Sequence, residues 1–502
     1  MNDEVAYALY LILSVAVGHW IQGFSSYNLR KITCGLLGFV SSIIFCKLDF
    51  LYAFVSSIIS SYICTSSFPF FKKYRRIVSF IWGFGFLTFF RTSTFFGFNQ
   101  PVPLSNAIQL VLTLKIIGLA GEVSDSEDRE VRAKKSEDSN DLSLEILYRN
   151  VSPTYLDSMC YLFSYVGIFT GPYYTYRTWH DAMIKSVEKC SNNACSISNY
   201  RKQTIKSLTL QTVVCTVIYI VLMKYFPSQY FWSLEWSMSG FLFRFLYLIP
   251  VFTWFRLRFY SAWLASETAL TSLNIGIYPS ISQPEPGAGP KKLSVLNQFF
   301  EEQNFAPSTS CNCSGESCTF WSNSTVHNID IYDCELSPTI SGKLRAWNRS
   351  VQYWLAVNVH QRTRSFPKSA RAFITVFVSA YWHGLHGGYY LSFGTAGALL
   401  SAEKVFPQLI ALWTKMFPQS APKTPEKEIS DSGLKKAKSF LWTYILGFWS
   451  MRAFEYMAVG FYVLAYSDTL RIWSDIMYYQ HIIAVFLIFT SFLVPSEKTV
   501  KN

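Results

Sequence analysis

The sequence predicts an all-α protein that crosses a membrane several times. Of its 502 residues, 50% are hydrophobic and 18% aromatic, whereas only 15% are charged, compared with about 25% in soluble domains. Several apolar windows reach or approach the roughly 17 to 25 residues that a spanning helix needs. About ten windows have this character: 5–21, 32–46, 50–65, 77–98, 107–121, 205–226, 241–264, 372–390, 440–466 and 481–494. We expect the shorter ones to be half-buried or re-entrant.

The first window predicts a retained helix, because it has neither a basic leader nor a small-residue cleavage signature. Basic residues follow the first helix at Arg30 and Lys31, and again within 72–76. The positive-inside rule places both loops in the cytosol and the N-terminus in the lumen. Basic cytosolic loops also explain the net charge of +12. No nucleic-acid-binding module is recognisable, so we expect no nucleic-acid partner.

Three polar segments interrupt an otherwise continuous membrane domain that covers residues 1–502. They are a charged loop or short surface helix at 122–149, a polar insertion at 280–333, and a loop at 415–438. No internal repeat is visible, which disfavours the inverted-repeat architecture of many transporters.

The polar insertion contains part of the cysteine content. Four of the eleven cysteines lie in it or directly after it: Cys311, Cys313, Cys318 and Cys334. The spacing C-x-C-x4-C matches no standard zinc pattern, so a structural metal or a disulfide is the less favoured reading and we expect no metal. Glycosylation sequons begin at Asn150, Asn312 and Asn323, and they matter only if their loops are lumenal.

The residues that point to chemistry are a histidine and an asparagine in apolar surroundings. His383 lies in SAYWHGLHGG and Asn348 lies thirty-five residues earlier in AWNRSVQYWLA. A titratable residue at membrane depth is costly, which makes it a functional-site hypothesis by default. Neutral imidazole can take a proton from a hydroxyl, and a carboxamide can orient a reacting group without adding charge. The alternative is that His383 only packs between helices.

Two neighbours of His383 are auxiliary candidates. His386 lies three residues further on, which predicts nearly the same helical face, so it is either an alternative base or a hydrogen-bond partner. Trp382 precedes the histidine directly. No G-x-S-x-G signature of a covalent acyl-enzyme is present, so direct transfer is the more economical chemistry.

Five ordered segments carry a family resemblance. They are LSNAIQLVLTLKIIGLAGEV (104–123), SYVGIFTGPYYTYRTW (164–179), IPVFTWFRLRFYSAWLASE (249–267), AWNRSVQYWLA (346–356) and SAYWHGLHGGYYLS (379–392). Together they resemble the membrane-bound O-acyltransferase superfamily, and most closely its lysophosphatidylinositol acyltransferase branch. The resemblance covers about 80–473, with 308–325 as the main unmatched part. The superfamily's histidine and asparagine correspond to His383 and Asn348.

The resemblance implies a bundle of about ten transmembrane helices around a catalytic tunnel in the endoplasmic reticulum membrane. It also implies acyl transfer from acyl-CoA, as co-substrate and without a cofactor, to the sn-2 hydroxyl of lysophosphatidylinositol in phospholipid remodelling, with a polyunsaturated chain favoured. His383 would deprotonate the hydroxyl and Asn348 would orient the reacting groups. Other acceptors, namely another lysophospholipid, a protein or a sterol, remain open. A more remote alternative is a transporter that uses His383 in a proton relay.

Charged residues suggest two further roles. Lys343, Arg345 and Arg349 surround Asn348 and are candidates for binding the phosphates of CoA or of the head group, with interfacial anchoring as the alternative. Other charges lie in or beside apolar sequence, and we expect them to pair across helices: Arg91, Lys115, Arg256, Arg258, Glu267, Glu403, Arg452 and Glu455.

Overall fold

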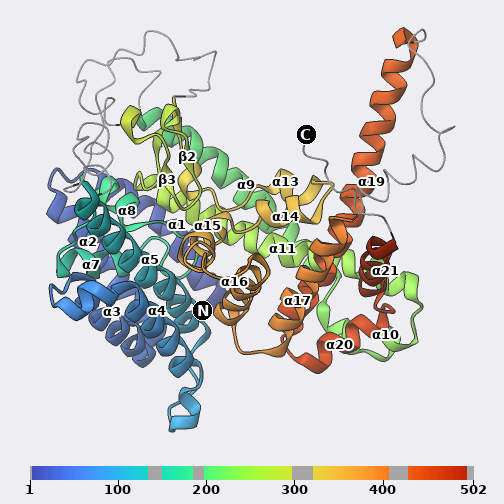
Figure 1. The fold of residues 1–502 in the computed structure, drawn as a ribbon, viewed down its shortest axis with the longest axis horizontal. Helices are drawn as coiled ribbons and strands as arrows, with labels where there is room; N and C mark the ends of the chain where they lie inside the picture. Colours follow the sequence, from blue (N-terminus) through green and yellow to red (C-terminus); the bar gives the residue numbers. More distant parts are fainter. Residues whose placement is uncertain (1–2, 134–149, 185–196, 297–319, 406–427, 494–502) are drawn as a thin grey trace. The chain divides into compact units, whose positions relative to one another are not determined.

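The computed structural model describes residues 3–133, 150–184, 197–296, 320–405 and 428–493. Within these ranges the chain is almost entirely helical (Figure 1), and each of the four strands is two residues long. The predicted all-α class is therefore confirmed. The chain divides into two compact units, and each is described by itself.

The first unit comprises Met1–Thr216, Phe259–Ile329 and Asn348–Ala372. Its helices are α1 (Asp3–Gln22), α2 (Tyr27–Cys46), α3 (Phe50–Thr65), α4 (Pro69–Arg91), α5 (Pro103–Ala133), α7 (Tyr155–Leu162), α8 (Tyr176–Ile184) and α15 (Arg349–Leu355), the last followed by a π-helical turn, η7 (Ala356–His360). Three further helices contribute residues to both units: α9 (Ile197–Tyr225), α11 (Phe241–Ser272) and α16 (Lys368–His383).

Helix α5 forms the centre of the first unit. It packs side by side with α3 and α4 (Figure 1). Ile108, Leu112, Ile116 and Leu119 recur at helical spacing along α5, and none of them is exposed. The small residue Gly83 of α4 lets the two helices approach, since a side chain there would contact Ile117 at 3.2 Å. Close packing around α5 therefore organises this unit.

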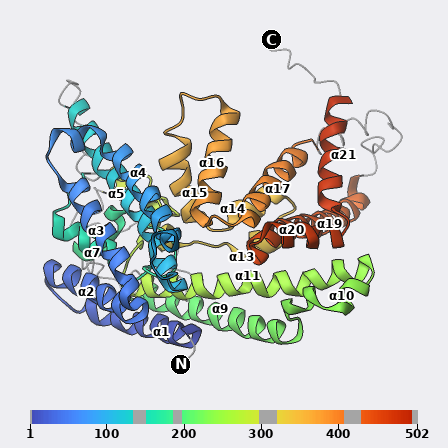
Figure 2. The same ribbon diagram turned by 90° about the horizontal axis from the view of Figure 1, so that it is seen from below.

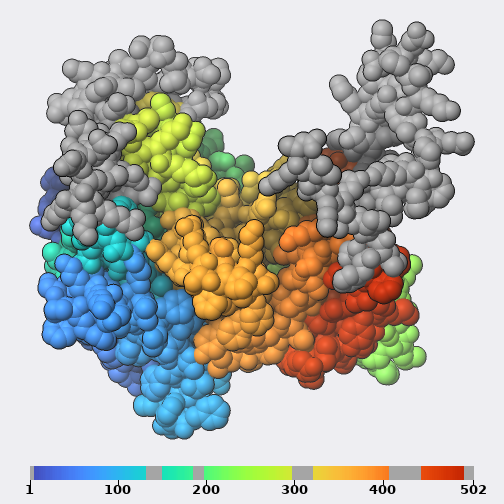
Figure 3. All heavy atoms as spheres, in the orientation of Figure 1, coloured from blue at the N-terminus to red at the C-terminus, as the bar shows by residue number. Residues whose placement is uncertain are grey.

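The outer faces of several helices are apolar, as expected for contact with lipid. Helix α4 forms part of the outer surface of its unit, coloured blue in Figure 3, and its Ile77 and Ile81 are 60% and 67% exposed. Four stretches in the described residues are long and apolar enough to cross a membrane: Val5–Gln22, Tyr27–Thr65, Pro103–Val131 and Ile197–Trp232. A bent pair, Tyr466–Asp475 and Tyr479–Thr490, raises the number to five.

This number is smaller than the ten windows in the sequence, and part of the difference follows from how the helices form. Two windows, 32–46 and 50–65, merge into one stretch of 39 residues, Tyr27–Thr65. The window 372–390 is interrupted where α16 ends at His383. The last window forms a helix of only 15 residues, α21, which follows the preceding helix at an angle of 81°. The implied tunnel stays a prediction.

The second unit comprises Val217–Arg258, Asp330–Trp347 and Phe373–Asn502. Its helices are α10 (Leu234–Met238), α13 (Ile331–Leu336), α14 (Ile340–Ala346), α17 (Gly387–Glu403), α19 (Glu428–Val463), α20 (Tyr466–Asp475) and α21 (Tyr479–Leu493). Figure 2 shows α17, α19 and α20 side by side. Trp473 of α20 stacks on Tyr456 of α19 with ring centroids 5.1 Å apart, and its indole nitrogen donates to the Tyr456 carbonyl at 3.1 Å. This pair joins the two helices in the core.

The first polar segment is helical in its described part, so of the two predicted alternatives, a charged loop or a short surface helix, the structure shows the helix. Helix α5 continues to Ala133, and its acidic residues pair with the basic residues of α4. Arg76 lies 2.6 Å from Asp125, and Arg75 forms an ion pair with Glu127. These pairs account for the regular structure of this end of α5. They also neutralise cations that the orientation argument had assigned to a free cytosolic loop, and the orientation stays a prediction.

Only parts of the other two polar segments belong to the described residues. In the insertion, β1 (Tyr278–Pro279) pairs with β4 (Trp321–Ser322), and β2 (Pro284–Glu285) pairs with β3 (Gly289–Pro290), both antiparallel. Cys311, Cys313, Cys318 and Asn312 lie outside the described residues. Cys334 is buried in α13. Within 415–438 the described part, 428–438, is the helical start of α19, which corrects the prediction of a loop there.

Candidate active site

His383 is the last residue of α16, and its ring lies among aromatic side chains of the second unit. Its centroid is 4.8 Å from that of Trp382, 5.0 Å from Phe461, 5.5 Å from Phe393 and 5.7 Å from Tyr389. The imidazole is half-buried. Aromatic rings from α16, α17 and α19 thus surround the imidazole and form an aromatic cage.

The glycines of the motif build this cage. A side chain at Gly384 would begin 2.5 Å from the Tyr389 ring, so glycine is needed for Tyr389 to reach His383. At Gly388 a side chain would collide with the carbonyl oxygens of Gly460 and Leu464. The Gly388 amide instead donates to the Leu464 carbonyl at 2.8 Å. The close approach of α17 and α19 brings Phe461, which follows Gly460, against the imidazole.

His386 does not share a helical face with His383, which corrects the prediction. Helix α16 ends at His383, and His386 has an extended conformation (φ −67°, ψ 137°) as the N-cap of α17. The intervening Gly384 breaks the helix. The His386 side chain is exposed, whereas Trp382 is buried and contacts the His383 ring edge-on. The two histidines therefore lie in different surroundings, and Trp382 makes a packing contact with His383. The choice of His383 as the base stays a prediction.

Asn348 lies in the first unit, at the N-cap of α15, in a left-handed conformation (φ 47°, ψ 51°). Asparagine tolerates this conformation better than most residues, but it remains uncommon outside glycine. N-cap asparagines usually use their side chain to accept from the helix. The Asn348 carboxamide does not, and it forms no hydrogen bond with any residue that the structure describes. A strained residue whose side chain is held back from capping is a candidate for function.

His383 and Asn348 belong to different units, so their predicted meeting in one cavity stays a prediction. The same holds for their roles in the reaction. Each residue nevertheless has surroundings that fit its role. One is a half-buried imidazole among aromatic rings, and the other is an available carboxamide on a strained turn.

Of the three phosphate-binding candidates, Lys343 is in the least suitable place. It is fully buried, and its ammonium donates to the carbonyls of Cys334 at 3.2 Å and Glu335 at 2.8 Å. It therefore satisfies the C-terminal end of α13. Arg345 is exposed on α14 and Arg349 is half-buried on α15, so these two remain candidates.

Comparison with known proteins adds the family. Residues 143–423 match the model of the membrane-bound O-acyltransferase family. A membrane-bound acylglycerophosphatidylinositol O-acyltransferase of Danio rerio is 30% identical over 484 residues, which cover 96% of this chain and 92% of the relative. The chain belongs to the membrane-bound O-acyltransferase family. Relatives with the same protein name from Homo sapiens and Drosophila melanogaster are 28% and 27% identical, cover 96% of this chain, and are themselves covered to 92% and 90%.

Membership in the membrane-bound O-acyltransferase family makes the protein a membrane-bound enzyme of acyl transfer and decides against the transporter alternative. Both His383 and Asn348 lie within the range that the family model matches. In the described residues no group of three or more His, Cys, Asp and Glu side chains is arranged to hold a metal ion.

This O-acyltransferase also has a buried charge network in its second unit. Arg256 of α11 lies 2.7 Å from Glu455 of α19 and 3.0 Å from Glu335 of α13, and Arg452 lies 2.9 Å from Glu455. The expected pairing of charges across helices is confirmed for Arg256 with Glu455, whereas Arg452 pairs with Glu455 within the same helix, α19. Lys115 differs, since its ammonium donates to the Tyr161 carbonyl and the Tyr174 hydroxyl.

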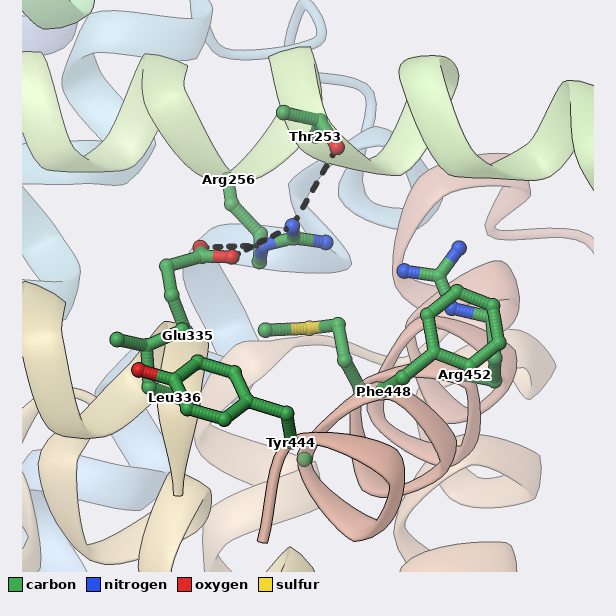
Figure 4. A pocket seen from close by; sticks show the side chains of 9 residues that line it. Thr253, Arg256, Glu335, Leu336, Tyr444, Phe448 and Arg452 are labelled. Carbon is green, nitrogen blue, oxygen red and sulfur yellow. Dashed lines mark hydrogen bonds and ion pairs between the residues drawn. The ribbon is translucent and has the colours of Figure 1, made fainter. Parts of the chain in front are cut away.

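The charge network borders a cavity of about 300 Å³. Figure 4 shows Arg256 and Glu335 pointing toward each other on one side, with Tyr444 and Phe448 of α19 on the other. Because Arg256 contacts two carboxylates and Arg452 contacts one, the cations on this wall are already compensated. The network is therefore better explained as pairing between helices than as a phosphate site.

Sequence reasoning missed Gly460 and Phe461, which complete the His383 cage from α19. A signal was present, because Gly460 interrupts an aromatic and aliphatic run, AVGFYVLAY. A glycine inside an apolar helix often marks a close helix approach. The sequence does not tell which helix comes close, and here it is α17 at Gly388.

Proposed function

We propose that this protein transfers an acyl group, preferentially polyunsaturated, from acyl-CoA to the sn-2 hydroxyl of lysophosphatidylinositol in the endoplasmic reticulum membrane. The observation that carries the proposal is the near full-length similarity to relatives that are named acylglycerophosphatidylinositol O-acyltransferases. The aromatic cage of His383 and the strained turn at Asn348 supply side chains suited to this chemistry.

In the proposed reaction, His383 accepts the proton of the acceptor hydroxyl as its oxygen attacks the thioester carbonyl. The new ester bond forms and the carbon–sulfur bond breaks. The thiolate of CoA leaves and takes the proton from the imidazolium, which restores the neutral ring. Asn348 orients the reacting groups through its carboxamide, which has hydrogen-bonding capacity on both its oxygen and its nitrogen.

Arg345 and Arg349 are proposed to contact phosphate oxygens of CoA or of the head group, since guanidinium groups can bind them with two donors. Replacing either arginine with glutamine should raise the KM for one substrate and change kcat little, because a phosphate far from the reacting atoms is bound equally in ground and transition states. If the KM for both substrates were unchanged, that arginine would not be a phosphate-binding residue.

The experiment is an acyl-transfer assay on the purified protein with a matrix of acyl-CoA donors and lysophospholipid head groups. Lysophosphatidylinositol should have the highest kcat/KM among the acceptors, and polyunsaturated donors should exceed saturated ones. A peptide acceptor and a sterol acceptor in the same assay test the alternatives of protein and sterol acylation. Preference for another acceptor would overturn the proposed substrate, and microscopy against a marker of the endoplasmic reticulum tests the location.

A further inference from the structure

The left-handed turn at Asn348 is held on its C-terminal side by one buried residue, Asn328. The amide of Arg349, directly after the turn, donates to the Asn328 carbonyl at 2.8 Å. The side chain of Asn328 accepts twice from Ser350, at 3.2 Å from its amide and at 2.6 Å from its hydroxyl. Asn328 and Ser350 are fully buried. The first two residues after Asn348 are therefore fixed by the backbone and the side chain of the same asparagine.

The orientation of the Asn328 amide follows from this geometry. A backbone amide can only donate, so the atom that faces the Ser350 nitrogen must be the Asn328 oxygen. The Asn328 side-chain nitrogen consequently points elsewhere and has no hydrogen-bond partner among the described residues. The side-chain oxygen of Asn328 thus accepts two hydrogen bonds from Ser350, and both hold the turn.

Asn328 is in turn held by a carboxylate on another helix. The backbone amide of Asn328 donates to one carboxylate oxygen of Glu267 at 2.7 Å, and the other oxygen lies 3.3 Å from a ring nitrogen of His327. Glu267 is in α11 and is fully buried. A buried carboxylate is expensive in free energy, so a residue that only fills space here would more economically be apolar. The carboxylate is suited to fixing residues 327–328 through one contact with the Asn328 backbone and one with the His327 ring.

A third contact links the turn to a separate segment. The Tyr173 amide donates to the Ser350 hydroxyl at 2.8 Å. That hydroxyl therefore accepts from one side and donates to Asn328 on the other, and it closes a chain that runs Glu267, Asn328, Ser350, Tyr173. Residues from three of the five sequence motifs meet in this way: 164–179, 249–267 and 346–356. All of them lie in the first unit.

We propose that Glu267, Asn328 and Ser350 are positioning residues that hold Asn348 in its strained conformation, so that its carboxamide is kept away from the helix and available to substrate. Strained backbone persists only where the surroundings over-determine it, and the chain of hydrogen bonds provides that constraint. This inference rests on the proposed function, because it assigns to the three residues an effect on acyl transfer that acts through Asn348.

The test uses pairs of variants with the same shape. Ser350→Thr and Ser350→Val add the same bulk at a buried position, and only threonine keeps the hydroxyl. Glu267→Gln and Glu267→Met are similarly matched, and only glutamine keeps an acceptor for the Asn328 amide. We expect the valine and methionine variants to lower kcat about tenfold or more with KM for both substrates nearly unchanged, and the threonine and glutamine variants to recover most of the rate.

A double-mutant cycle separates positioning from general stability. Asn348→Gly keeps the left-handed turn accessible and deletes the carboxamide. If Ser350 acts through Asn348, Ser350→Val should lower kcat in the wild type and leave the residual rate of Asn348→Gly unchanged. Membrane abundance and thermal unfolding of the purified variants provide the structural control.

Three results would overturn the inference. The first is equal kcat for Ser350→Val and Ser350→Thr, and the second is the same loss from Ser350→Val with and without the Asn348 carboxamide. The third is wild-type kcat in Asn348→Gly. A wild type that acylates no acceptor refutes the proposed function and the inference together. Transfer to a different acceptor refutes only the head group, and the cycle on that acceptor then decides the inference.

Discussion

The contact between Gly388 and Gly460 allows a sharp prediction about the His383 cage. In Gly388→Ala, the new methyl group would lie 2.7 Å from the Leu464 carbonyl oxygen and closer still to that of Gly460, whereas ordinary contacts begin at 3.4 Å. Helices α17 and α19 must therefore separate locally by about 1 Å. Overpacking of this kind costs about 1–3 kcal/mol of stability. Because Phe461 follows Gly460, the separation also loosens the surroundings of His383, and a displacement of about 1 Å can cost up to about 100-fold in rate.

Gly394→Ala is the matched control, since it lies in the same helix and a side chain there meets nothing within 4 Å. Alanine is a better helix former than glycine by about 1 kcal/mol, so this control should be slightly stabilised and fully active. The assays are thermal unfolding of the purified protein and the initial rate of acyl transfer. If Gly388→Ala matched Gly394→Ala in both assays, the argument that the glycine contact builds the cage would be refuted.

Three further predictions concern stability. Glu455→Gln removes the carboxylate that Arg256 and Arg452 share and should cost about 3–5 kcal/mol. Glu285 is exposed and pairs with Lys291, so Glu285→Gln should lower the free energy of unfolding by less than about 1 kcal/mol. If chemical unfolding gave equal losses of stability for Glu455→Gln and Glu285→Gln, burial would not explain the strength of the Glu455 pairs. Burial lowers the pKa of Lys343 to about 8, below its value of about 10.4 in the unfolded chain. The unfolded state therefore binds more protons between these values, so the free energy of unfolding should rise with pH across this window. In Lys343→Met the free energy of unfolding should not rise in this way. If it had the same pH dependence in the variant and the wild type, Lys343 would not be the group responsible. Asn348→Ala should be about 1 kcal/mol less stable than Asn348→Gly, because only glycine adopts a positive φ without cost, and equal unfolding temperatures would argue against a strained turn.

The sequence was most informative where a polar residue lies in apolar surroundings. His383 and Asn348 stood out for this reason, and both have distinctive environments in the structure: an aromatic cage and a left-handed turn. The pairing of Arg256 with Glu455 was predictable on the same basis, since an intramembrane charge needs a partner. The free-energy cost of burying polar groups was therefore a useful guide to which residues have specific partners or surroundings in the structure.

Features that depend on where helices end or meet were not predictable. The prediction that His386 shares a helical face with His383 was wrong, because α16 ends at His383 and His386 precedes the first residue of α17. Lys343 resembled its basic neighbours in sequence, but only tertiary contacts show that it is buried against the end of α13. The extension of α5 to Ala133 depends on pairing with arginines of α4, which are about fifty residues earlier in the chain. Local sequence does not contain such long-range contacts.

The most direct measurement is the turnover of His383→Ala compared with His386→Ala in acyl transfer from acyl-CoA to lysophosphatidylinositol, at matched membrane abundance. Loss of a general base lowers the rate by about 10²- to 10⁴-fold, so His383→Ala should fall in this range and His386→Ala should keep at least about a tenth of the wild-type rate. Near-normal turnover in His383→Ala, or equal losses in the two variants, would contradict the assignment of His383 as the catalytic base.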